Sequence, residues 1–162
     1  MTDTETTSPH RRKFLVIVDD TPECRVALRY ACGRAGSTNG QVALLRVIEP
    51  GDFQHWLSVE ERMREEAREE AERLLQGLAA EISASVHIMP ELMVREGKSF
   101  DEVLAQIDED PQVRVLVLGA ATGPEGPGPL VSALAGKMPG NMHIPVTVVP
   151  GNLTDKQVDE LV

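Results

Sequence analysis

Short apolar runs recur along this chain, and most are followed by a stretch in which apolar residues return at helical spacing. Aliphatic runs bounded by turn residues are typical of strands that are buried on both faces. The clearest strands are expected at residues 14–18, 42–48, 113–118 and 145–149. A weaker strand at 86–94 contains Pro90, which cannot donate a ladder hydrogen bond and therefore favours the edge of a sheet.

Helix signals separate these strands. Thr21 is a good N-cap for a helix with Pro22 at its first position, and this helix is expected to end near 33–36. A long helix is expected after a capping box formed by Ser58 and Glu61, with its apolar stripe facing the core. The members of that stripe are Val59, Met63, Ala67, Ala71, Leu74, Leu78 and Ile82.

Three shorter helices complete the pattern. One is expected after a second capping box, Ser99 with Glu102, and another over residues 130–137, with Pro129 at its first position. The last follows a third capping box, Thr154 with Gln157. The alternation of strands and helices predicts one α/β domain: an open parallel sheet with helices on both faces.

In such a sheet, ligands bind beyond the carboxyl ends of the strands, where the winding reverses. Two strand ends carry chemistry: Asp19-Asp20 after the first strand, and the glycine-rich loop 119–132 after the fourth. If these two strands are neighbours, both ends border one crevice. The glycine-rich loop has two interpretations, a ligand-binding loop or a plain surface connection. The second carboxylate of the first strand end, Asp20, is best explained as part of the strand end and helix cap.

Composition narrows the function classes. The chain has 162 residues, enough for one domain with a proper core, and a formal net charge of −10, which argues against nucleic acid and anionic membrane surfaces as partners. No stretch has the apolar length of a membrane span, and residues 1–12 are expected to form a loose polar tail rather than a secretory signal. Cys24 and Cys32 lie eight residues apart in one predicted helix, too far to bridge, so we expect free buried thiols in a cytoplasmic protein.

The sequence contains no motif that is typical of a catalytic or metal-binding site. The four histidines are scattered, with no carboxylate or cysteine at metal-ligand spacing, and no serine or cysteine lies in a nucleophile turn. A phospho-accepting receiver domain, superficially suggested by residues 17–20, is rejected because no later strand ends in an acceptor aspartate. We expect no enzymatic activity beyond weak ATP hydrolysis. Trp56 is expected either to stack on a base or anchor a partner or, as we prefer, to pack beneath the entry to the long helix.

Several strand motifs, in order and spacing, resemble the universal stress protein family. They are Phe-Leu-Val-Ile-Val-Asp at 14–19, Ala-Leu-Leu-Arg-Val-Ile-Glu at 43–49, Val-Leu-Val-Leu-Gly at 115–119 and Ile-Pro-Val-Thr-Val-Val at 144–149. The resemblance covers a domain at 13–150, followed by an extension at 151–162 with a short helix. It implies a five-stranded parallel sheet in which the first and fourth strands are neighbours, and a homodimer that pairs through the strand at 145–149.

Many members of that family bind ATP through a signature after the fourth strand: Gly, two residues, Gly, nine residues, then Gly-Ser or Gly-Thr. Here Gly119 fits the first position, the second falls on Thr122 with Gly123 one residue late, and the final pair falls on Ser132-Ala133. The family's adenosine contacts carry over to Asp19, for the ribose hydroxyls, and to the backbone of Val47, for the adenine edge. These positions predict a site for ATP or a related adenine nucleotide, with Mg²⁺ accompanying it.

Two functions are therefore expected of this chain. The first is a regulatory module whose glycine-rich loop becomes ordered when an adenine nucleotide binds. The second is a nucleotide-free homodimeric interaction module of the same fold, which acts in a stress response through protein partners.

Overall fold

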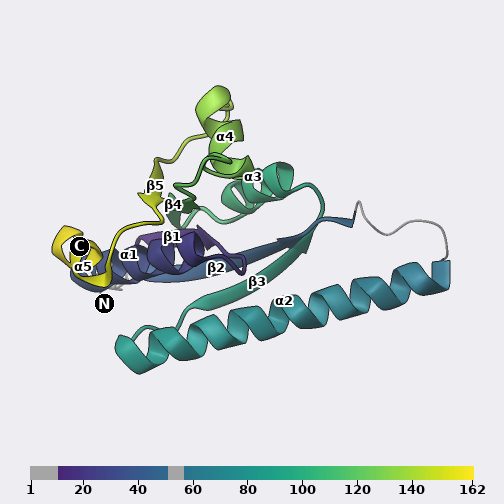
Figure 1. The fold of residues 1–162 in the computed structure, drawn as a ribbon, viewed down its shortest axis with the longest axis horizontal. Helices are drawn as coiled ribbons and strands as arrows, with labels where there is room; N and C mark the ends of the chain where they lie inside the picture. Colours follow the sequence, from purple (N-terminus) through teal and green to yellow (C-terminus); the bar gives the residue numbers. More distant parts are fainter. Residues whose placement is uncertain (1–10, 51–56) are drawn as a thin grey trace, which may run out of the picture.

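The computed structural model describes residues 11–50 and 57–162, and it contains one open sheet of five parallel strands in the order β3-β2-β1-β4-β5 (Figure 1). The predicted fold class is confirmed, and so is the expected pairing of the first and fourth strands. The strands are β1 (Lys13–Ile17), β2 (Gln41–Ile48), β3 (Glu91–Glu96), β4 (Val113–Ala120) and β5 (Val146–Pro150).

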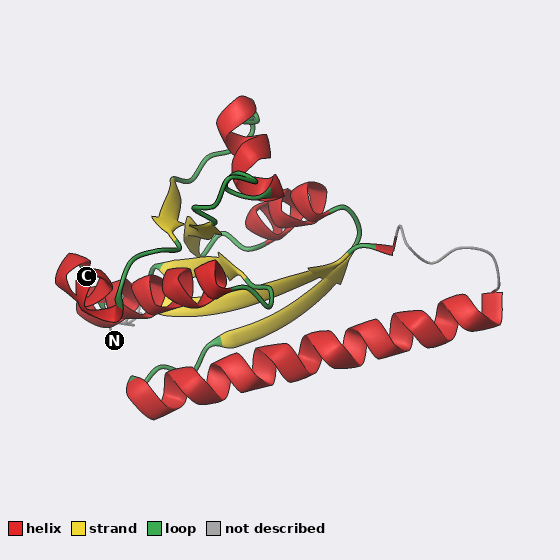
Figure 2. Ribbon diagram, viewed as in Figure 1, coloured by secondary structure: helices red, strands yellow, loops and turns green. Residues whose placement is uncertain are grey.

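The helices cover both faces of this sheet, as the two cores between sheet and helices show (Figures 1 and 2). Helices α1 (Pro22–Thr38) and α2 (Leu57–Ser85) lie on one face, and α3 (Ser99–Glu109) and α4 (Pro129–Gly136) lie on the other. The short α5 (Asp155–Leu161) lies beside α1.

Alternation along β1 divides the core in two. Phe14 and Val16 point toward α1 and α2, whereas Leu15 points toward α3 and α4, and all three are buried. A strand with both faces covered is apolar at nearly every position, which is why the central strands could be recognised as continuous aliphatic runs. Lys13 at the start of β1 is the exception. Its buried ammonium donates to Glu91 at 3.0 Å and to Asp110 at 2.6 Å.

Helix α1 begins as predicted and ends later than predicted. Thr21 is its N-cap and accepts from the N–H of Cys24, and Pro22 occupies the first turn. The helix continues through Gly33 and Gly36 to Thr38, and Asn39 ends it in the left-handed region at φ 54°. Gly33 serves packing instead, because a Cβ there would lie 2.6 Å from a methyl group of Val162.

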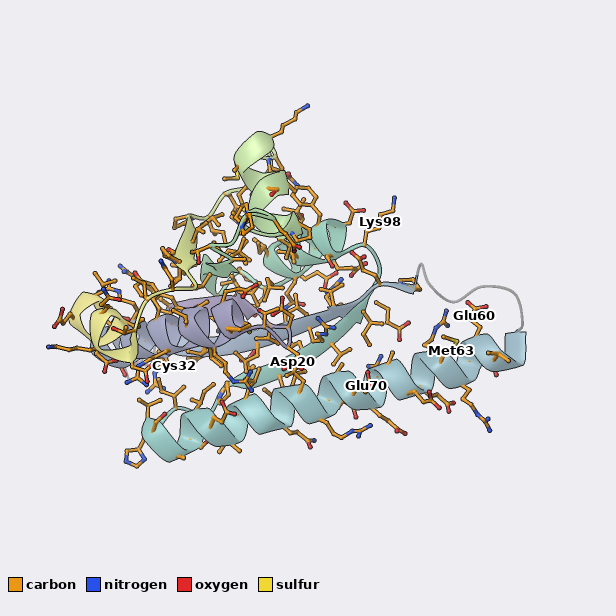
Figure 3. The ribbon with its side chains drawn as sticks, viewed as in Figure 1. Asp20, Cys32, Glu60, Met63, Glu70 and Lys98 are labelled. Atoms are coloured by element: carbon orange, nitrogen blue, oxygen red, sulfur yellow. The ribbon has the colours of Figure 1, made fainter. Side chains whose placement is uncertain are left out.

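Helix α2 extends well beyond the sheet, and the predicted core stripe is only half buried. Ala71, Leu78 and Ile82 are buried, but Val59 and Met63 are 48% and 38% exposed. Met63 lies on the part of α2 that extends past the sheet (Figure 3). A helix of 29 residues is about 43 Å long at 1.5 Å per residue, whereas the strand of eight residues beneath it spans roughly 26 Å. The helix also begins at Leu57, so Ser58 lies inside its first turn and is not the predicted cap.

The connection from β3 to α3 corrects two further expectations. β3 lies at the sheet edge, as predicted, but it begins only after Pro90, at Glu91. The predicted Ser99–Glu102 capping box is wrong: α3 starts at Ser99 itself, with Lys98 at the N-cap position and no side-chain cap there. The carboxylate of Glu49, from the end of β2, accepts from the Ser99 N–H at 2.9 Å and caps the helix instead.

The chain after β5 turns back onto the domain. Thr154 and Gln157 form the predicted capping box, with both reciprocal hydrogen bonds present. Val158 is buried, and Asp159 accepts from the guanidinium of Arg29 on α1 at 2.8 and 2.9 Å. The C-terminal extension is therefore held to α1 by apolar packing and an ion pair.

Candidate functional site

A cavity of about 540 Å³ opens at the carboxyl ends of β1, β2 and β4. It lies at the switch point of the sheet, because the chain winds toward β2 and β3 on one side of β1 and toward β4 and β5 on the other. Its walls come from both predicted strand ends and also from the start of α3 and the start of α4. The cavity is within the usual size of a small-molecule site.

Asp19 forms part of the cavity wall immediately after β1. Its carboxylate accepts from the hydroxyl of Thr21, and its N–H donates to the sulfur of Cys24 at 3.4 Å. Burial raises the pKa of the Cys24 thiol to about 11, although the N–H of Asp19 favours the thiolate. Asp19 is thus oriented by its neighbours, and the thiol beside it is a neutral, packed group rather than a nucleophile.

Asp20 lies elsewhere. Its side chain is 88% exposed, comes within 3.8 Å of the Arg25 guanidinium, and is absent from the cavity wall. It borders a second hollow, of about 710 Å³, between α2 and the end of β2, which Glu70 also lines (Figure 3). The expectation that Asp20 belongs to the strand end and helix entry rather than to the ligand site agrees with this position.

Gly119 brings β4 against the start of α1. A Cβ built on Gly119 would lie 2.3 Å from the carbonyl oxygen of Glu23, and one on Gly151 would lie 2.6 Å from the Glu23 Cβ. Both glycines therefore allow backbone and helix to approach each other closely. Gly119 borders the cavity, but its lack of a side chain is already required by packing.

The loop before α4 gives the cavity its other wall. Gly126 and Gly128 have φ values of +92° and +110°, which side-chain-bearing residues rarely adopt, and a Cβ on either would meet nothing within 4 Å. Only Gly128 of these two lines the cavity, directly before α4. The N–H groups of Leu130 and Val131 precede the first hydrogen bond of the helix, from the Ser132 N–H to the Gly128 carbonyl at 2.9 Å.

The structure brings four of the seven predicted site residues together and leaves three outside. Asp19, Val47, Gly119 and Ala133 line the cavity. Thr122, Gly123 and Ser132 are exposed and do not line it. Because α4 already begins at Pro129, Ser132 lies inside the helix with its N–H engaged, and the loop carries Thr122 and Gly123 away from the cavity.

Other lining residues escaped the sequence analysis. Arg46, Glu49, Lys98, Ser99 and Phe100 form the wall between β2 and α3. The hydrogen bond from the Ser99 N–H lowers the pKa of Glu49, with the Ser99 hydroxyl contributing in the same direction. Glu49 and Ser99 are 50 positions apart in the sequence, and no local motif predicts their hydrogen bond. Gly128 did have a signal, since a glycine followed by proline marks a special turn and a helix start.

The part of the chain that the structure describes holds no cluster of three or more histidine, cysteine or carboxylate groups that could bind a metal ion. None of its helices is both long enough and apolar enough to cross a bilayer. The cavity wall combines carboxylates, two basic side chains and backbone N–H groups with apolar residues. Trp56 and the loop at 51–56, for which stacking or burial was expected, lie outside the described residues.

The fold recurs in solved structures of low sequence identity. The universal stress protein UspA from Lactobacillus plantarum is 16% identical, with a TM-score of 0.71 over 85% of this chain and 97% of that one. A family protein from Arabidopsis thaliana, solved with AMP bound, is 18% identical, with a TM-score of 0.58 over 86% and 91%. A universal stress protein from Archaeoglobus fulgidus in complex with dAMP is 18% identical, with a TM-score of 0.56 over 85% and 96%.

Sequence comparison gives the family directly. No curated protein matches this chain significantly. The sequence profile of the universal stress protein family, however, matches residues 10–150, which include all five strands and the whole cavity wall. The chain therefore belongs to the universal stress protein family.

Proposed function

We propose that this chain is a regulatory module that binds an adenine nucleotide in the cavity at the ends of β1, β2 and β4. The observation that supports this most is the meeting of Asp19 with the start of α4 across one cavity of about 540 Å³. Proteins of the same fold have been solved with AMP, cAMP and dAMP. Binding would order the loop between β4 and α4 and change what the surface presents to partners.

Each part of the cavity has a role in this proposal. The carboxylate of Asp19 would accept from the ribose hydroxyls, and the backbone of Val47 would pair with the edge of adenine. β2 continues past Leu45, the last residue that pairs with β1, so Val47 stands where the cavity begins. The phosphate would lie at Gly128 and the free N–H groups of α4, where the helix dipole favours an anion.

Titration calorimetry with ATP, ADP and AMP, each with and without Mg²⁺, tests the proposal on the wild-type chain. The decisive variant is Asp19→Asn, which keeps the shape of the side chain and removes its charge. Asp20→Asn is the matched control, because it makes the same change one residue later, outside the cavity. Affinity should fall about tenfold in the first variant only, the usual effect of losing a charged hydrogen-bond partner. Absence of heat with all three nucleotides would refute the proposal.

Gly119 is unsuitable for this test. Any side chain there would collide with the Glu23 carbonyl, so loss of binding in a Gly119 variant would report damaged packing. The same fact favours the second candidate function, a nucleotide-free interaction module, because it explains the glycine after β4 without a ligand. That candidate would stand if the folded protein bound none of the nucleotides yet formed a dimer.

Both candidates include a homodimer that pairs through β5. β5 is an edge strand whose only described neighbour is β4, and Val148 on it is 44% exposed. Val148→Lys should convert the dimer to a monomer in sedimentation analysis. Leu92→Lys, on the opposite edge strand and 40% exposed, is the matched control and should leave the dimer intact. A wild-type protein that sediments as a monomer at high concentration would exclude this arrangement.

Mg²⁺ and hydrolysis are secondary parts of the proposal. With no cluster of metal ligands among the described residues, Mg²⁺ would arrive with the phosphates of a nucleotide rather than occupy a site of its own. Weak ATP hydrolysis would then be an accompaniment of binding. The two free, buried thiols agree with residence in the reducing cytoplasm.

A further inference from the structure

We infer that the cavity selects adenine nucleotides with a single phosphate and disfavours triphosphates. This inference rests on the proposed nucleotide site and concerns only how many phosphates it accommodates. The decisive region is the segment from Gly119 to Gly136, which would lie against the phosphate chain.

The donors in that segment are sufficient for one phosphate. Among the residues that line the cavity, the N–H groups of Gly128, Leu130 and Val131 lie at the start of α4, before its first hydrogen bond. They stand together at one point, and the open space around Gly128 lets an anion approach the backbone. The other helix starts that line the cavity belong to α1 and α3, where the N–H groups of Cys24 and Ser99 already donate to Thr21 and to Glu49.

The rest of the segment is poor in donors. Pro124, Pro127 and Pro129 have no N–H. The N–H of Ala121 already donates to the Pro127 carbonyl at 3.2 Å, and the N–H of Gly126 donates to the Gly123 carbonyl at the same distance. The loop is thus closed by its own hydrogen bonds where a longer phosphate chain would need free ones.

Charge acts in the same direction. Residues 119–136 include no lysine or arginine, and their only charged side chain is Glu125. The cavity wall itself adds the carboxylates of Asp19, Glu23 and Glu49. The two basic residues of the wall, Arg46 and Lys98, come from β2 and from the start of α3, and the Lys98 side chain extends outward beside α3 (Figure 3). A β- or γ-phosphate that follows residues 119–136 would therefore meet one carboxylate and no lysine or arginine of this segment.

Calorimetry at fixed ionic strength, with adenosine, AMP and ATP, measures the preference. AMP should bind at least about tenfold more tightly than adenosine, the gain expected from charge-assisted hydrogen bonds. ATP in the presence of EDTA should bind more weakly than AMP, and ATP with Mg²⁺ no more tightly than AMP. Tighter binding of ATP in either condition would overturn the inference while leaving the nucleotide site intact. Absence of binding by all three would instead refute the site itself.

Two glycines provide a matched pair of variants. Gly126 and Gly128 both have positive φ and both have open space for a Cβ, so alanine costs similar backbone strain at each. Only Gly128 lines the cavity. Gly128→Ala should lower the affinity for AMP toward that for adenosine and leave adenosine binding unchanged, while Gly126→Ala should change neither. Equal losses in the two variants would contradict a phosphate position at Gly128.

A gain-of-function variant tests the charge argument. Glu125 is exposed and lies outside the cavity, so Glu125→Lys should not disturb folding or adenosine binding. It should raise the affinity for ATP relative to AMP by up to about fivefold, the range of an exposed ion pair. The rise should shrink as salt is added. An unchanged ratio at low salt would show that the outer phosphates do not pass this loop and would overturn the inference.

Discussion

Gly119→Ala is the sharpest test of how β4 meets α1. The new Cβ would lie 2.3 Å from the Glu23 carbonyl oxygen, 2.6 Å from its carbonyl carbon and 3.1 Å from the Cys24 N. All three atoms belong to the backbone at the start of α1, so no side-chain rotation can relieve the contact. Either the helix or the strand end has to move.

The displacement sets the size of the effect. Ordinary van der Waals contact begins near 3.4 Å, so the start of α1 would have to move by about 1 Å relative to β4. The helix is fixed there by its Thr21 cap and by the buried Cys24. We expect a loss of about 3 kcal/mol in the free energy of unfolding, the upper end of the usual cost of overpacking. For a chain of this length that corresponds to a fall of roughly 6–12 °C in the melting temperature.

Urea denaturation followed by far-ultraviolet circular dichroism measures this loss. Gly123→Ala is the control, because it adds the same methyl group to the same loop, where a Cβ meets nothing within 4 Å and φ is not in the left-handed region. The control should differ from wild type by less than about 0.5 kcal/mol. A Gly119→Ala protein with an unchanged urea midpoint would refute the packing role of this glycine. The absence of a side chain at this position would then have to be explained by ligand binding.

Three further predictions concern the cap, the C-terminal helix and the thiols. The hydrogen bond from the Ser99 N–H holds the pKa of Glu49 below its usual 4.5. The charged carboxylate therefore stabilises the folded protein above that pH, and this stabilisation is lost as the pH falls through the lowered pKa. In urea titrations, the stability difference between wild type and Glu49→Gln should shrink below about pH 4.5. Val158→Ala removes the buried anchor of α5 and should lower the free energy of unfolding by about 2 kcal/mol, with amide exchange in α5 rising first; unchanged exchange would contradict the docking. Burial raises the pKa of Cys24 to about 11 and that of Cys32 to about 12, so a thiol-specific disulfide reagent at pH 8 should label neither in the folded protein and both in urea.

The order of the elements could be predicted because each central strand is buried on both faces. Such strands are apolar at nearly every position, and residues 14–18, 42–48 and 113–118 differ from the observed β1, β2 and β4 by no more than two residues at either end. Helix ends that depend on the backbone conformation of a single residue were harder to predict. Gly33 and Gly36 suggested the end of α1, but Asn39, followed by a glycine, is the residue that takes the left-handed conformation.

Contacts between distant segments could not be predicted at all. The cap of α3 comes from Glu49, fifty residues earlier, and it replaces the local capping box that Ser99 and Glu102 suggested. The exposed first half of α2 follows from a mismatch of lengths between helix and sheet, which the apolar stripe containing Val59 and Met63 does not reveal. Local patterns determine which elements form, whereas their overlap in space determines which faces are buried.

The two glycines at the ends of the β4–α4 loop separate the fold from the ligand. Gly119 matches the first position of the nucleotide signature, yet the Glu23 carbonyl alone forbids a side chain there, so this match is expected in any chain that packs α1 against β4 in this way. Gly128 matches no position of the signature, yet its positive φ leaves its α-carbon facing open cavity beside unpaired N–H groups. A residue that only packing requires cannot discriminate a binding protein from a non-binding one. The case for a nucleotide in this chain therefore depends on Gly128 and Asp19, and variants at these two positions are the ones that can decide it.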